Sequence, residues 1–148
     1  MKRLLFTVGL CLFVIVSFAQ NPVQWQFSAK KTADKTYQII LTATVDNPWH
    51  IYSQTTPDGG PLPTKITFTK NPMISLEGHT KENGKLMKKY EEVFGIDVKY
   101  FDGDVQFVQS VKLKNNIKTN LSGSVEFMAC TNQQCLTPMS VPFNLKLE

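Results

Sequence analysis

YQIILTATV, residues 37–45, is the stretch that most strongly indicates the fold. Apolar side chains occupy every second position from Tyr37 to Val45, and mostly polar side chains lie between them. Because successive side chains of a β-strand point to opposite faces, this alternation is typical of a strand with one face in a core and one in water. The stretch therefore predicts a half-buried β-strand.

The same two-residue period recurs along the rest of the chain. The other segments that show it are 24–29, 66–69, 74–76, 105–113, 125–129 and 139–147. About six to eight such strands in one small domain predict an antiparallel two-sheet sandwich. The sequence therefore favours an all-β fold.

Residues typical of turns and loops separate these segments. The predicted turns are Ala33-Asp34-Lys35, a hairpin-type turn at Asp102-Gly103-Asp104, Asn115-Asn116 and Ser122-Gly123. The Pro- and Gly-rich stretch 55–63 predicts a loop. The charged segment 81–95 has apolar residues near helical spacing, and it predicts either one short helix or a long loop.

Residues 1–19 have the pattern of a secretory signal peptide. A short basic region precedes a nearly continuous apolar run over residues 4–18, and small residues lie just before an expected cut at Gln20. We therefore expect a single mature domain of residues 20–148 in an oxidising compartment. An uncleaved N-terminal anchor is the alternative.

Cleavage changes both the charge and the cysteine count. The full chain has 148 residues and a net charge of +4; without Lys2 and Arg3, 14 basic residues remain against 12 acidic ones, which gives +2. This weak basicity, with no cluster of basic and aromatic residues, argues against a nucleic-acid partner. Loss of Cys11 leaves an even pair, Cys130 and Cys135, as expected of an exported protein.

The strongest chemical feature is MACTNQQCLTP, residues 128–138. Cys130 and Cys135 flank a four-residue polar loop between two predicted strands, and they can form a disulfide if the loop turns back. Closing so small a ring stabilises a fold by about 2 kcal/mol, against a typical domain stability of about 5–15 kcal/mol. The pair could therefore be either a structural disulfide or one that exchanges with other thiols.

Two further segments carry side chains that could serve a thiol. His50 and Tyr52, in the segment 46–52, could shield a sulfur and tune its pKa; the alternative is a core tryptophan beside an exposed histidine. Exposed apolar residues in the charged segment 90–95, which ends in Gly95, suggest a lid. The alternative there is a solvated loop with buried anchors.

Other chemistry has less support. The two cysteines could join Met128, Met139, His50 or His79 as soft ligands for copper, although methionines on sandwich strands are usually part of the core. Neither a Gly-x-Ser-x-Gly motif nor a phosphate-binding loop is present. We therefore expect no cofactor, no resident metal and no small-molecule substrate.

Taken together, these segments resemble the N-terminal periplasmic domain of the thiol:disulfide interchange protein DsbD, over roughly residues 23–147. The residues that carry the resemblance are 46–52, 90–95 and 125–138 with the strand that follows. The resemblance implies an immunoglobulin-like antiparallel β-sandwich located in the periplasm.

The resemblance also implies roles for particular residues. Cys135 corresponds to the cysteine that forms mixed disulfides with partners, and Cys130 to the one that resolves them. His50, where the family has a tyrosine, and Tyr52 would line the site from the facing strand. The implied cap loop over the pair consists of Glu91, Glu92, Val93, Phe94 and Gly95.

The function implied is a redox relay that acts, if active, as a protein-disulfide reductase-type carrier. It would pass electrons between a membrane or thioredoxin-like donor, acting in trans, and periplasmic disulfide partners such as isomerases and cytochrome-maturation thioredoxins. The alternative is a non-catalytic envelope binding module with a structural disulfide, and copper handling is a third possibility.

Overall fold

The computed structural model describes residues 21–148, so the predicted signal peptide and its expected cut before Gln20 lie outside the described residues. Within the described part the chain forms eleven β-strands and no helix, and hence no helix that could span a membrane. The strands are β1 (Val23–Ala33), β2 (Thr36–Val45), β3 (His50–Tyr52), β4 (Lys65–Phe68), β5 (Ile74–Gly84), β6 (Met87–Glu91), β7 (Ile96–Phe101), β8 (Val105–Leu113), β9 (Thr119–Phe127), β10 (Ala129–Cys130) and β11 (Met139–Leu147).

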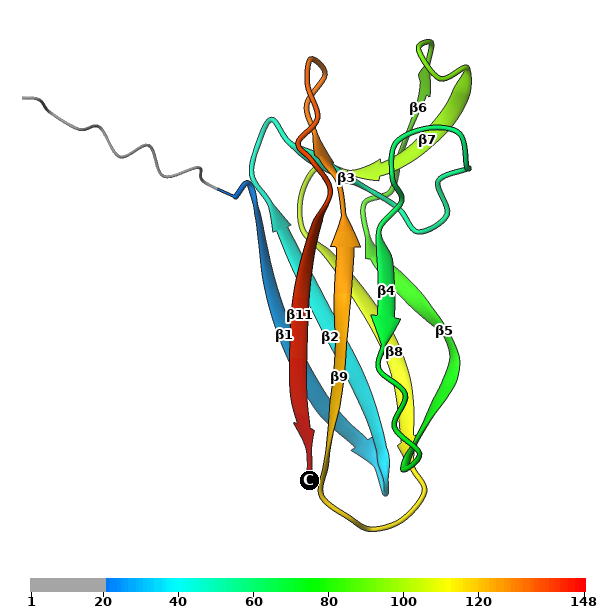
Figure 1. The fold of residues 1–148 in the computed structure, drawn as a ribbon, viewed down its shortest axis with the longest axis vertical. Helices are drawn as coiled ribbons and strands as arrows, with labels where there is room; N and C mark the ends of the chain where they lie inside the picture. Colours follow the sequence, from blue (N-terminus) through cyan, green and yellow to red (C-terminus); the bar gives the residue numbers. More distant parts are fainter. Residues whose placement is uncertain (1–20) are drawn as a thin grey trace, which may run out of the picture.

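Two antiparallel sheets form the body of the molecule. One has the order β1-β2-β8-β5 and the other the order β11-β9-β4, and they lie face to face along the long axis (Figure 1). A third antiparallel sheet, β10-β3-β7-β6, is built at one end. The predicted all-β antiparallel sandwich is confirmed.

The alternating residues of β2 form the centre of the core, as their spacing predicts. The side chains on the inward face, from Tyr37 to Val45, are each at most 6% exposed. Phe107 of β8 lies beside Leu41 in the same sheet, Phe127 of β9 belongs to the opposite sheet, and Trp25 of β1 packs against both phenylalanines. Burial of alternating apolar residues from both sheets therefore holds the sandwich together.

The prediction of a helix or long loop over residues 81–95 is wrong. The segment is the end of β5 followed by β6, which forms a hairpin with β7. Met87 pairs with Tyr100 and Glu91 with Ile96, so β6 pairs with β7 along its whole length. This non-local pairing outweighs the near-helical spacing of a few apolar residues.

Two of the predicted turns also differ from the structure. Residues 102–104 do not close a hairpin, because β7 and β8 belong to different sheets and the bend carries the chain from one to the other. Gly123 lies inside β9, opposite Phe143 and Phe68. A Cβ at Gly123 would lie 2.4 Å from the backbone oxygen of Thr67, so glycine is required here by close packing and not by a turn.

A buried glutamine stabilises an irregularity in β5. The register of β5 against β8 shifts between Glu77 and Lys81, which leaves backbone groups of the bulge without ladder partners. Gln109, 2% exposed, donates to the backbone oxygen of Glu77 (3.0 Å) and accepts from the Thr80 hydroxyl (2.9 Å). Its amide therefore replaces the missing ladder bonds.

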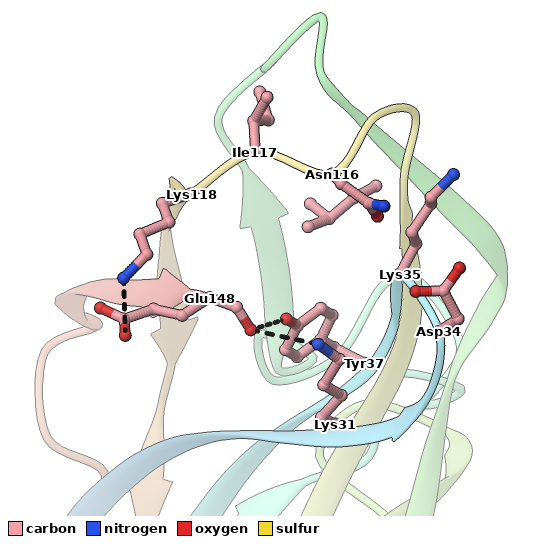
Figure 2. A pocket seen from close by; sticks show the side chains of 9 residues that line it. Lys31, Asp34, Lys35, Tyr37, Asn116, Ile117, Lys118 and Glu148 are labelled. Atoms are coloured by element: carbon pink, nitrogen blue, oxygen red, sulfur yellow. Dashed lines mark hydrogen bonds and ion pairs between the residues drawn. The ribbon is translucent and has the colours of Figure 1, made fainter.

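The end of the sandwich opposite the third sheet is held by the last residue of the chain. The Tyr37 hydroxyl and the Lys31 ammonium donate to the backbone oxygen of Glu148, and Lys118 pairs with its carboxylate at 3.6 Å (Figure 2). These contacts bridge a hollow of about 330 Å³ whose lining includes three lysines and the acids Asp34 and Glu148. The basic groups of the hollow are thus partly engaged by the chain itself.

We predict that Gln109→Leu lowers the free energy of unfolding by about 1–3 kcal/mol, because the Glu77 carbonyl and the Thr80 hydroxyl lose a buried partner. Urea unfolding followed by circular dichroism measures the change. Gln106→Leu is the matched control, since Gln106 is exposed on the same strand. Equal effects of the two substitutions would contradict the role given to Gln109.

Candidate functional site

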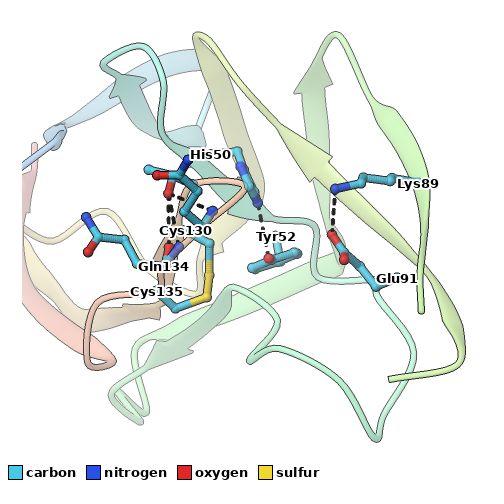
Figure 3. A network of polar contacts seen from close by, with 9 residues as sticks. His50, Tyr52, Lys89, Glu91, Cys130, Gln134 and Cys135 are labelled. Atoms are coloured by element: carbon cyan, nitrogen blue, oxygen red, sulfur yellow. Dashed lines mark hydrogen bonds and ion pairs between the residues drawn. A yellow bond between two sulfur atoms is a disulfide. The ribbon is translucent and has the colours of Figure 1, made fainter. Parts of the chain in front are cut away.

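The two cysteines form a disulfide at the end of the molecule that carries the third sheet (Figure 3). Their Cα atoms are 4.0 Å apart. The chain turns back between them: the backbone N–H of Thr131 donates to the oxygen of Gln134 (2.7 Å), and that of Leu136 donates to the oxygen of Ala129 (2.9 Å). The polar loop predicted between two strands is therefore a tight hairpin.

The two sulfur-bearing residues differ in their access to solvent. Cys130 is 1% exposed and packs with Tyr52 and Val98, whereas Cys135 is exposed. A thiolate can attack a disulfide only at a sulfur that it can reach. The arrangement therefore offers Cys135 to an incoming thiolate and shields Cys130.

A groove lies beside the cysteine hairpin. It has a volume of about 410 Å³ and is lined by Pro48 and Trp49 on one side and by residues 131–134 on the other. The Thr131 hydroxyl accepts from the backbone N–H groups of Gln133 and Gln134, both at 3.1 Å, which fixes the loop that forms this wall. The groove is thus a preformed surface next to the cysteine hairpin.

The strand that faces the disulfide carries the two predicted lining residues. His50 of β3 is directly opposite Cys130 of β10, and side chains of opposed residues project to the same face of a sheet. Tyr52, two residues on, shares that face, and its hydroxyl lies 3.1 Å from His50 Nε2 (Figure 3). The His50 ring also packs 4.9 Å from that of Tyr100, centroid to centroid. The structure thus brings these residues together, while their chemical roles stay predictions.

Burial decides the charge state of this pair. It lowers the pKa of His50, an effect increased by Lys89 and opposed by Glu91 and then by Asp102. Burial also raises the pKa of Tyr52 to about 12, with further contributions from Glu91 and Tyr100. Both side chains are therefore neutral near pH 7.

A loop that the sequence reasoning did not explain supports the third sheet. Residues 53–64 form a loop whose two ends are held together, because the Thr64 hydroxyl and N–H both donate to the backbone oxygen of Tyr52 (2.6 and 3.2 Å). At the other end, the Glu82 carboxylate accepts from the Ser53 hydroxyl and the Gln54 N–H, each at 2.7 Å. In the sequence, Glu82 was the one residue that could have indicated this contact. It lies in the segment 81–95, which was not predicted to be a strand.

The predicted cap residues form the tip of the β6–β7 hairpin, which projects from the same end as the cysteine hairpin (Figure 1). The backbone N–H groups of Phe94 and Gly95 donate to the oxygen of Glu91, and Gly95 has a φ of 68°. Val93 is 87% exposed and Phe94 is 45% exposed. Val93 therefore does not cover the sulfurs in this structure, and the cap stays a prediction.

Of the residues considered as soft metal ligands, His50 and Met128 lie beside Cys130, whereas His79 lies on β5 and Met139 lies on β11 opposite Phe127. Among residues 21–148 there is no group of three or more His, Cys, Asp or Glu side chains that could hold a metal ion.

Fold and site together define a small β-sandwich domain with a half-exposed disulfide at one end. The chain belongs to the family of N-terminal domains of the thiol:disulfide interchange protein DsbD, whose sequence profile matches residues 16–147. Thiol–disulfide interchange is therefore the chemistry of its family, and the predicted immunoglobulin-like sandwich is confirmed.

Three solved structures of related domains share this fold. The N-terminal periplasmic domain of ScsB from Proteus mirabilis has a TM-score of 0.59 and 19% identity over 86% of this chain, which spans 47% of that one. The DsbD N-terminal domain of Neisseria meningitidis in the reduced form has a TM-score of 0.50 and 12% identity, with 80% of this chain and 82% of that chain covered. The same domain in complex with the PilB N-terminal domain gives 0.52 and 10%, covering 82% and 80%. No curated protein sequence matches significantly.

We predict that reducing the disulfide leaves the domain folded. The six-residue ring contributes about 2 kcal/mol, while the core between the two main sheets does not involve either sulfur. Circular dichroism with and without a reductant should show the same β signal, and urea unfolding should show a loss of about 2 kcal/mol. Cooperative unfolding on reduction at room temperature would show that the disulfide is structural.

Proposed function

We propose that this protein is a periplasmic thiol–disulfide exchange carrier that relays electrons through Cys130 and Cys135. The observation that carries the proposal is the unequal burial of the two cysteines in a domain of this family. An exchanging pair needs one sulfur that partners can reach and one that acts from within. A purely structural disulfide has no need of that division.

The reaction follows from this geometry. A partner thiolate attacks Cys135 Sγ, the Cys130–Cys135 bond breaks, and Cys130 leaves as a thiolate that takes up a proton. A second thiolate of the partner then attacks the mixed disulfide at the partner's sulfur, which releases reduced Cys135 and an oxidised partner. The carrier gains two electrons, and the reverse sequence delivers them to a disulfide substrate.

Thioredoxin-fold proteins are the proposed donors and acceptors, with a membrane electron transporter acting in trans. The family supports this proposal, as does the complex that the related DsbD domain of Neisseria meningitidis forms with the PilB N-terminal domain. The periplasmic location is supported by the signal-peptide pattern of residues 1–19 and by the related ScsB domain, which is described as periplasmic. Residues 20–148 would act as one mature domain.

We predict that Cys130→Ala traps a mixed disulfide with a thioredoxin-fold partner, because no internal thiol remains to resolve it. Cys135→Ala should trap none, since the remaining sulfur is buried. Non-reducing electrophoresis after mixing each variant with the oxidised partner measures the adduct. Equal trapping by the two variants would remove the assignment, and trapping by neither would favour the binding module with a structural disulfide.

Residues 91–95 are proposed to act as a cap that closes over the reduced pair. Closure needs the hairpin tip to move from the exposed position it has here, and Gly95, at φ 68°, is the residue best able to absorb the change. Apolar cover would exclude water and raise the cost of forming a thiolate at Cys135. Glu91 and Glu92 would add to that cost.

If the cap closes, Val93→Ala with Phe94→Ala should speed alkylation of the reduced protein by iodoacetamide, and a tenfold gain would correspond to about 1.4 kcal/mol of lost protection. Leu86→Ala is the control, because Leu86 is an exposed apolar residue at the other end of β6. Unfolding by urea should change little. An alkylation rate equal to that of the control would show that these residues are not a cap.

A further inference from the structure

We propose that His50 is the acid–base group of Cys130: it takes the proton of the Cys130 thiol when that sulfur attacks, and returns it when that sulfur leaves. The inference rests on the proposed exchange function. The burial of Cys130 is the reason that such a group is needed. A thiolate at Cys130 would form among Tyr52, Val98 and their apolar neighbours, where water cannot solvate it.

The register of the third sheet places one suitable group there. His50 is opposite Cys130 in the β3–β10 pair, and side chains so paired have Cβ atoms about 4.5–5.5 Å apart. Both residues are buried, so a proton transferred between them need not pass through bulk water. The Tyr52 hydroxyl, 3.1 Å from His50 Nε2, holds the ring in place and is a positioning residue.

The other groups that face His50 are poorly suited to the task. Tyr52, with a pKa of about 12, gives up its proton too reluctantly. Lys89 and Glu91 of β6 pair with each other at 3.2 Å and act on His50 only through their charges, as does Asp102 beyond β7. Tyr100 of β7 packs against the ring. Burial lowers the pKa of His50, so the imidazole is neutral and able to accept a proton near pH 7.

The step can be followed with an aromatic disulfide reagent, dithiobis-nitrobenzoate, in place of a partner. In the reduced protein, Cys135 attacks the reagent and releases one thiobenzoate. Cys130 then loses its proton to His50 and attacks Cys135 Sγ, which breaks the mixed disulfide and releases a second thiobenzoate. The protein dithiol is oxidised and the reagent is reduced, and the second release reports on Cys130 alone.

His50→Gln should slow the second release by at least about tenfold at neutral pH and leave the first within about twofold. Tyr52→Phe should slow the second release less. His79 is the other histidine of the chain and lies on β5. The control substitution His79→Gln should leave both releases unchanged. A folded His50→Gln protein with an unchanged second release would overturn the proposal.

Wild-type protein supplies a test that does not depend on how the variant folds. Its second release should be nearly flat between the pKa of His50, measured by NMR, and the range where thiols titrate, and should fall at lower pH as the imidazole becomes protonated. A rate that falls tenfold per pH unit across that whole interval would overturn the proposal. Because the reagent replaces the partner, these outcomes are separate from the trapping experiment, whose failure would count against the exchange function instead.

Discussion

The pairing of β3 with β10 is the constraint on which the site depends. β10 continues the chain of β9 beyond the main sheet, and β3 receives it at the end of the sandwich. Ile51 and Ala129, opposed in this pair, face the main core, and Phe101 of β7 lies opposite Ile51. The alternate residues, among them Cys130 and His50, must then face away from that core. A single short ladder thus separates the face that packs on the main core from the face that carries the disulfide.

This separation explains how the fold can tolerate a labile bond. The main sheets bury their apolar residues without help from either sulfur, and the third sheet is secured by the loop 53–64, which the Glu82 carboxylate anchors to β5. That strand keeps its bulge through the buried amide of Gln109. Polar contacts that do not involve the disulfide therefore hold this end of the molecule in place.

The sequence predicted best what short-range patterns control. Alternation over residues 37–45 located the central strand because burial on one face repeats every two residues. The same pattern could not resolve residues 81–95, whose strand pairing is with residues 96–100 and 105–108 further along the chain. The sequence also predicted a turn at Gly123, because the close approach of Gly123 to Thr67 depends on another strand. The residues alone suggested that His50 could serve a thiol, and only the resemblance placed it at the cysteine site, since a register that joins residues 50 and 130 has no local signal.

The cysteine hairpin has a kinetic consequence. Its backbone bonds, from Thr131 to Gln134 and from Leu136 to Ala129, involve no sulfur, so they can still form when the disulfide is broken. In the reduced domain the two thiols would then face each other at a very high effective concentration, as in a well-oriented intramolecular reaction. In the proposed exchange, a mixed disulfide between Cys135 and a partner would have the Cys130 thiol already in position to attack Cys135 Sγ and displace the partner. The attack of Cys130 would then limit the lifetime of the mixed disulfide and keep it short, unless the bound partner separates the two strands of the hairpin.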